Sequence, residues 1–277
     1  MIATARSAWF AILATFTLCA AAAHADPAKF AAIWTKPATA RDAEAHHDMT
    51  SAQSQAKVTA LAAKGLGPRM VNGYLSNGVV LFAAVFHKES AAWMAHHDLD
   101  SAAYQQKFDQ YVQQGYRLEW VSGYPVNGVP HFAGVWSKAG GPAWAAHHQL
   151  DSAAYQAKFN EHKAQGYRPS VVNPYVVNGA VHYAAIFVKE GVHYEAHHAL
   201  TAADYQAKFN QLAAQGMFPD FIGGYDLGGA THVSAVWLKP AHQVQVRHDL
   251  PSAAYQQQYD AQLKNGFGLK IVSGYGR

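Results

Sequence analysis

The chain has 277 residues, one cysteine and a formal net charge of +3 at pH 7, with 13% aromatic and 14% charged residues. So few charged and so many aromatic residues exclude a disordered chain, because such chains show the opposite balance. The small positive surplus gives no argument for nucleic-acid binding, and we expect no nucleic-acid partner.

Residues 1–25 have the features of a secretory signal. Arg6 precedes an apolar stretch, and the segment ends in the A-x-A sequence Ala23-His24-Ala25, which predicts cleavage before Asp26. No later segment approaches about 20 apolar residues, so membrane insertion is not expected. Cys19 lies inside the signal, so the mature chain needs no disulfide. We therefore expect a secreted or periplasmic protein with a single repeat domain at residues 26–277.

One histidine recurs at steps of 50, 51, 50 and 50 residues along the chain, as His47, His97, His148, His198 and His248. The text around it recurs as well, for example WMAHHDLDSAAYQQKF at residues 93–108 and WAAHHQLDSAAYQAKF at residues 144–159. Self-similarity at a fixed period of this length is typical of repeat architectures. The sequence therefore predicts five tandem repeats of about 50 residues.

Each repeat predicts a capped helix directly after its histidine. Good N-cap residues stand three positions after the histidine in four copies, as Thr50, Asp100, Asp151 and Thr201. Apolar residues follow at helical spacing, such as Tyr104, Phe108 and Tyr111. The helices are expected to end at the glycines in the left-handed C′ position, which are Gly65, Gly115, Gly166, Gly216 and Gly266.

A β-hairpin is predicted after each helix. Its first strand ends at a tyrosine in every copy, namely Tyr74, Tyr124, Tyr175, Tyr225 and Tyr275. Asn-Gly or Gly-Gly then joins it to an apolar return strand, and Asn-Gly between two apolar runs is typical of a type I′ hairpin turn. The segment before each histidine is expected to form a third strand. The predicted class is therefore α+β, with a hairpin, a third strand and a helix in each repeat.

The two ends of the mature chain each hold half of a hairpin. Residues 26–36 read as a return strand without a first strand, and residues 270–277 read as a first strand that stops before its turn. Two unpaired aromatic edge strands would favour aggregation. We therefore expect the terminal strands to pair, the sheet to curve strongly or close, and the helices to lie outside it.

The repeat text AHH-x-L-D-S-A-A-Y-Q-x-K-F, followed by Q-G-Y-R and V-x-G-Y-x-V-N-G, resembles the bacterial tandem-repeat domain. That domain also precedes the serine-β-lactamase-like catalytic domain of fungal polyglycine hydrolases. The resemblance covers residues 26–277 and implies a curved sheet or half-barrel that carries helices. It implies little about activity, because the chemistry of those hydrolases belongs to the other domain. The S-x-x-K match at Ser54 is accidental, because Tyr104 and Tyr155 fill its place in other copies.

The repeated histidines allow three interpretations. The plainest is a structural role at the corner between strand and helix. A metal site could form if several repeats each contributed one ligand from the set His47, His97, His148, His198 and His248. A Ser101-His97-Asp98 triad is disfavoured, because Asp98 becomes Gln149 and Ala199 in other copies. Residues that break the repeat are better places to look for chemistry, namely Glu119, His162, His193 and Asp220.

Aromatic columns are the best binding candidates. One face of the return strands carries Trp34, Trp136 and Trp237, and the positions before the histidines carry Trp93, Trp144 and Tyr194. Core packing is the plainer interpretation, and an aromatic face that stacks on sugars or peptide is the sharper one. We expect an exported, non-catalytic protein that needs no cofactor and binds an extracellular polymer, either glycan or peptide. The alternatives are a hydrolase related to polyglycine hydrolases or serine hydrolases, and divalent metal binding through the histidines.

Overall fold

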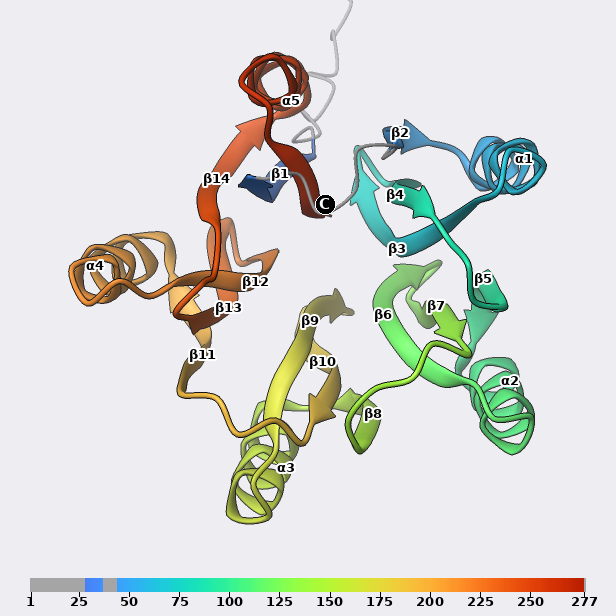
Figure 1. Ribbon diagram of the computed structural model, residues 1–277, viewed down its shortest axis with the longest axis horizontal. Helices are drawn as coiled ribbons and strands as arrows, with labels where there is room; N and C mark the ends of the chain where they lie inside the picture. Colours follow the sequence, from blue (N-terminus) through green and yellow to red (C-terminus); the bar gives the residue numbers. More distant parts are fainter. Residues whose placement is uncertain (1–27, 37–43, 277) are drawn as a thin grey trace, which may run out of the picture.

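The computed structural model describes residues 28–36 and 44–276, which form five similar units of three antiparallel strands and one helix. The expected signal peptide, residues 1–25, lies outside the described residues. The five sheets stand around a central axis like the blades of a propeller, and the helices lie at the rim (Figure 1). The fold is therefore α+β, and its repeating unit is the one that the sequence predicts.

The helices begin at the predicted caps. Thr50, Asp100, Asp151 and Thr201 each accept a hydrogen bond from the backbone N–H three residues later, whereas Pro251 offers no side-chain cap. The C′ glycines have φ between 74° and 82°, which side chains larger than glycine rarely adopt. The helices are α1 (Ser51–Ala62), α2 (Ser101–Gln113), α3 (Ser152–Ala164), α4 (Ala202–Ala213) and α5 (Ser252–Lys264).

Each sheet has an inner, a middle and an outer strand, counted from the central axis (Figure 1). The inner strands are β3 (Leu66–Ser76), β6 (Arg117–Val126), β9 (Arg168–Val177), β12 (Phe218–Leu227) and β15 (Gly268–Tyr275). The middle strands are β4 (Val79–Lys88), β7 (Val129–Ser137), β10 (Ala180–Val188), β13 (Ala230–Leu238) and β1 (Lys29–Lys36). The outer strands are β2 (Glu44–Met49), β5 (Trp93–Asp100), β8 (Trp144–Leu150), β11 (Tyr194–Thr201) and β14 (Gln243–Pro251).

The hairpins join inner and middle strands through the predicted two-residue turns. Asn77 and Gly78 have φ of 54° and 75°, and the other three turns also have positive φ at both positions. These are type I′ angles, whose twist matches that of the flanking strands. The predicted third strand is also present, because each outer strand pairs with the middle strand of its own unit.

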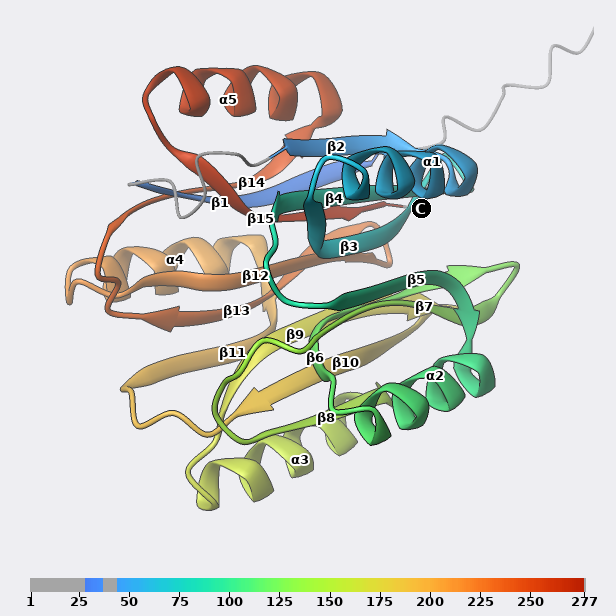
Figure 2. The same ribbon diagram turned by 45° about the vertical axis from the view of Figure 1, so that its right-hand side comes forward.

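The fifth sheet is built from both ends of the chain. Strand β1 lies between β14 and β15, with Phe30 opposite Gly274 on one side and opposite Leu250 on the other (Figure 2). The N-terminal strand is thus the middle strand of the C-terminal unit. A middle strand has both edges hydrogen-bonded, so this arrangement ties the first described residues to the last and closes the ring.

The expectation of one strongly curved or closed sheet is wrong, because the ring consists of five separate three-stranded sheets. Inner strands of neighbouring sheets lie side by side, but side chains take the place of a backbone ladder between them. The N–H of Gly73 donates to Ser122 Oγ over 3.1 Å, and the N–H of Gly274 donates to Asn72 Oδ1 over 2.7 Å. Each of these hydrogen bonds gives a backbone N–H of an inner strand a side-chain acceptor in the neighbouring repeat. The N–H then needs no partner strand, so the sheets remain separate.

The core lies between each sheet and its helix. Helix tyrosines such as Tyr104 and Tyr205 pack on the middle strands, and the middle strands are buried along most of their length. None of the described helices is long and apolar enough to cross a membrane.

Candidate functional site

Three of the candidate tryptophans belong to the core. Trp34, Trp136 and Trp237 are 0% exposed. Helix tyrosines cover them, since the ring of Tyr104 lies 5.9 Å from that of Trp136 and the ring of Tyr205 lies 5.8 Å from that of Trp237. Their side chains therefore cannot form an open stacking face, and the expectation of such a face does not hold for these three residues.

The other three candidate aromatics pack between repeats. The ring of Trp144 meets Phe108 edge-on at 5.8 Å, and the ring of Tyr194 meets Phe159 edge-on at 6.4 Å. Trp93 lies so close to Gly67 that a Cβ there would come within 2.7 Å of the indole nitrogen. Each of these half-buried side chains contacts the preceding repeat, which gives the aromatic column a structural role.

The corner histidines also join neighbouring repeats. His148 Nε2 lies 3.2 Å from the hydroxyl of Ser101, the first residue of the preceding helix, and its ring meets Tyr104 edge-on. His198 makes the same two contacts with α3, His97 contacts the Ser51 hydroxyl of α1 and packs on Phe82 of β4, and His248 packs on Tyr205 of α4. His47 packs on Tyr255 of α5, so the set of contacts runs around the whole ring. Burial lowers the pKa of His47, His148 and His198, which favours the neutral ring.

A serine, a histidine and an acid do meet at these joints, but not as a catalytic triad. Ser101 contacts His148 and Gln149 of the next repeat, and the serine facing His97 is Ser51 of α1. Ser51 donates directly to Asp98, whose carboxylate lies 3.9 Å from the same His97 Nε2 that faces Ser51. In a triad the acid holds the other ring nitrogen and does not bind the serine.

The metal interpretation has no ligand set in the described part of the chain, where no three histidine, cysteine or acidic side chains converge. Each corner histidine faces aromatic rings and, in most joints, a hydroxyl group, and the five joints lie in five different places around the ring. The first histidines of the pairs likewise turn to their own units, as in the 2.6 Å contact of His96 with the Tyr111 hydroxyl.

Two recesses open at opposite ends of the central axis. Between them lies a layer of buried side chains from the inner strands, in which Trp120 of β6 and Phe221 of β12 contact each other with ring centroids 5.8 Å apart. These two residues come from non-neighbouring repeats, so their contact spans the axis and separates the recesses. Each recess is therefore a pocket with a floor and not part of a pore.

The first of these, here called the charged recess, has a volume of about 630 Å³ and lies at the N-terminal ends of the inner strands. One position of each inner strand faces it, and the five copies differ there: Arg69, Glu119, Ser170, Asp220 and Lys270. Further charges come from Arg117 and Arg168 and from loop residues such as Glu190. The recess is thus the place where the repeats diverge most in charge.

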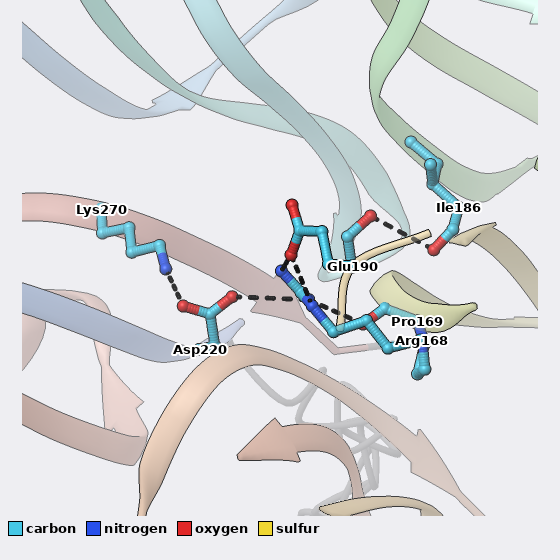
Figure 3. Close-up of polar contacts among 7 residues, drawn as sticks. Arg168, Pro169, Ile186, Glu190, Asp220 and Lys270 are labelled. Carbon is cyan, nitrogen blue, oxygen red and sulfur yellow. Dashed lines mark hydrogen bonds and ion pairs between the residues drawn. The ribbon is translucent and has the colours of Figure 1, made fainter. Parts of the chain in front are cut away.

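Ion pairs connect the repeats around the charged recess (Figure 3). Arg168, 9% exposed, donates to Glu190 over 2.8 Å from Nε and lies 3.9 Å from Asp220, which also pairs with Lys270. Arg117 pairs with Glu119 over 2.9 Å. Among the described residues, Arg69 has no ion pair within 4 Å and its side chain is exposed. Of Arg69 and Lys270, the two cations at the divergent inner-strand position, Arg69 is therefore the one available to a ligand.

Burial changes the acid–base behaviour of two groups in the charged recess. It raises the pKa of Glu119, against the opposing effect of Arg117 and Arg69. It lowers the pKa of His87, and the charge of Arg69 adds to that effect. A carboxylic acid with a raised pKa in a cleft is a common feature of functional sites.

The repeat-breaking residues have different fates. Glu119 and Asp220 converge in the charged recess, whereas His162 is buried in α3 with its Nε2 2.9 Å from His147 Nε2 and His193 is an exposed loop residue. Sequence reasoning missed Arg69, Ser170 and Lys270. Comparing the five copies column by column would have found them, because no other inner-strand position carries both charge signs.

A sequence model of the family described as "Polyglycine hydrolase-like, structural repeat" matches residues 40–89, 90–139, 141–190, 191–240 and 241–277. The first four matched segments each contain one complete outer strand, helix, inner strand and middle strand, and the fifth lacks only the middle strand that β1 supplies. No curated protein sequence matches the chain. Because the five matches cover most of its length, the chain belongs to the polyglycine hydrolase-like structural repeat family.

Proposed function

We propose that the chain is an exported, non-catalytic binding module, and that the charged recess holds a charged peptide segment of an extracellular polymer. The observation that carries this proposal is the divergence of one inner-strand position in all five repeats, from Arg69 through Ser170 to Lys270, at a single recess. Positions that all five repeats share maintain the fold. A position that differs in every copy, and whose side chains converge, is the natural place for recognition.

The charges of the recess favour a peptide over a neutral glycan. Cationic and anionic side chains lie side by side there, as in the pairs Arg117–Glu119 and Lys270–Asp220. A peptide that carries both ammonium and carboxylate groups can satisfy both signs at once. Neutral sugars are typically bound on open aromatic faces, and three of the candidate tryptophans are covered by helices. The volume of about 630 Å³ is within the usual range of ligand pockets.

The test is a peptide and glycan array probed with residues 26–277, followed by calorimetric titration of the ligands it finds. We expect charged peptides to bind, with an affinity that falls as salt is added. Arg69→Gln should weaken binding about tenfold or more, because this cation is free of ion pairs and its loss leaves no buried partner. The matched control is Lys107→Gln, which removes a half-buried cation of α2 that lies over the Tyr111 ring and lines neither recess, and it should leave binding unchanged.

Two outcomes would contradict the proposal. Selective binding of neutral glycans, unaffected by Arg69→Gln, would move the site away from the charged recess. Cleavage of a peptide or ester substrate, with fluorophosphonate labelling that disappears in one serine variant, would make the protein a hydrolase. Ser170 is the serine to replace first, because it lines the recess and its hydroxyl donates to the carbonyl of Ile186 over 3.2 Å.

A further inference from the structure

The second recess, here called the axial cavity, opens at the other end of the axis and has a volume of about 410 Å³. Its wall consists of the C-terminal ends of the inner strands and the hairpin turns that follow them. The tyrosines at these strand ends are buried, and four of them pack on an inner-strand glycine of the preceding repeat. A Cβ on Gly123 would lie 2.4 Å from the ring of Tyr175, for example. Apart from Asn72 and Asn178, the cavity is lined by backbone, tyrosine rings and small or apolar side chains.

One carboxylate breaks this apolar lining. The residue after each strand-end tyrosine faces the cavity, and in four repeats it is uncharged, as Leu75, Pro125, Val176 and Gly276. The fourth repeat carries Asp226 there, 9% exposed, and it is the only charged residue among those that line the cavity in the described part of the chain.

The carboxylate of Asp226 is only half satisfied. Its Oδ1 accepts a hydrogen bond from the Thr231 hydroxyl over 2.8 Å, and no described residue donates to Oδ2. Lys29 donates to the same Thr231 hydroxyl over 3.0 Å and pairs with Asp249 at 3.5 Å, but it makes no direct ion pair with Asp226. Oδ2 is therefore free to accept a hydrogen bond from the cavity side, and a cationic N–H donor supplied by a ligand would form a charge-assisted hydrogen bond with it.

We propose that the axial cavity binds a small apolar molecule carrying one ammonium group, with Asp226 as its counter-ion. Leu75, Pro125 and Val176 give the apolar part a wall to pack on, and the free Oδ2 of Asp226 fixes the position of the charged end. This site is separate from the charged recess, because the layer of Trp120 and Phe221 lies between them. The proposal does not depend on the proposed function.

The experiment titrates residues 26–277 with benzylamine, benzyl alcohol and benzoate near neutral pH, and follows binding by NMR shifts of the cavity residues. Benzylamine should bind about ten- to a hundredfold more tightly than benzyl alcohol, because only the ammonium makes a charged hydrogen bond with Asp226. Benzoate should not bind. Asp226→Asn and Asp226→Leu should each abolish the preference for the amine, and the leucine variant copies the residue that the first repeat carries at this position.

The matched control is Asp109→Asn, which removes an acid from the exposed face of α2, outside both recesses, and should leave amine binding unchanged. Equal binding of benzylamine and benzyl alcohol would overturn the proposal. So would amine binding that survives in both Asp226 variants, or the absence of any amine binding up to millimolar concentration.

Discussion

Pro174 and Gly223 replace two groups that hydrogen-bond to each other elsewhere in the ring. In the second repeat, the N–H of Gly123 donates to Asn173 of the third over 2.8 Å. Proline has no N–H and glycine has no side chain, so donor and acceptor are both missing at the next junction. A Cβ on Gly223 would also lie 2.7 Å from Pro174 Cδ. The two residues therefore form a matched pair that substitutes packing for a hydrogen bond.

Each single substitution should destabilise the fold. Pro174→Gly creates a buried N–H without an acceptor, which costs about 1–3 kcal/mol. It also raises the conformational entropy of the unfolded chain, which lowers the free energy of unfolding by a further 0.4–1 kcal/mol or so. Gly223→Ser forces its Cβ against the proline ring, and overpacking of this kind costs about 1–3 kcal/mol. In the double variant the new serine can accept from the new N–H, as Ser122 does from Gly73 over 3.1 Å.

The two changes should thus be strongly coupled, by about 2 kcal/mol in the free energy of unfolding. Urea unfolding of residues 26–277, followed by tryptophan fluorescence and circular dichroism with matching m-values, gives the four free energies of the cycle. Ser273→Ala is the calibration, because it removes the acceptor of the Gly224 N–H and should cost as much as the orphaned N–H in Pro174→Gly. Additivity within about 0.5 kcal/mol would refute the account of the inter-repeat bonds.

Three further predictions concern the joints and the closure of the ring. Ala199 has φ of 57° at the position where Asp98 bonds to the preceding helix, so Ala199→Asp should raise the free energy of unfolding by about 1 kcal/mol; an unchanged urea midpoint would contradict this. Deleting residues 269–277 removes most of β15 and should abolish cooperative unfolding, whereas a nearly unchanged melting temperature would exclude a closed ring. Burial lowers the pKa of His148, so near and below pH 6.5 the unfolded chain binds more protons than the folded chain, and the free energy of unfolding should fall as the pH drops below 6.5. His148→Gln should make that fall shallower.

Features set by local chemistry could be predicted from the sequence. The Asn77-Gly78 turn, the Thr50 cap and the C′ glycine Gly65 depend on residues within a few positions of one another. Their conformations follow from steric limits on φ and from nearby hydrogen bonds, which the sequence displays directly. The repeat then supplies each of these signals several times, so the order of elements in the unit could be read with little ambiguity.

Contacts between repeats could not be predicted in the same way. Asn72 and Ser122 look like ordinary polar residues of a strand, yet they bond to the backbone of the neighbouring repeat and keep the sheets apart. Periodicity placed Trp136 on one face of its strand, but a period cannot tell whether a helix covers that face. Asp98 showed no sign of its left-handed backbone, φ 58°, because aspartate tolerates many conformations.

The closed ring explains why the five repeats agree in some positions and differ in others. A change at a joint, such as His148 against Tyr104, weakens the contact between two sheets, and one open joint leaves two unprotected edges in the whole ring. Such positions are therefore constrained in every copy. Positions at the ends of the axis, such as Arg69 and Asp226, face solvent-accessible recesses and do not form a joint between two repeats. They can diverge copy by copy, so recognition can change there without loss of the fold.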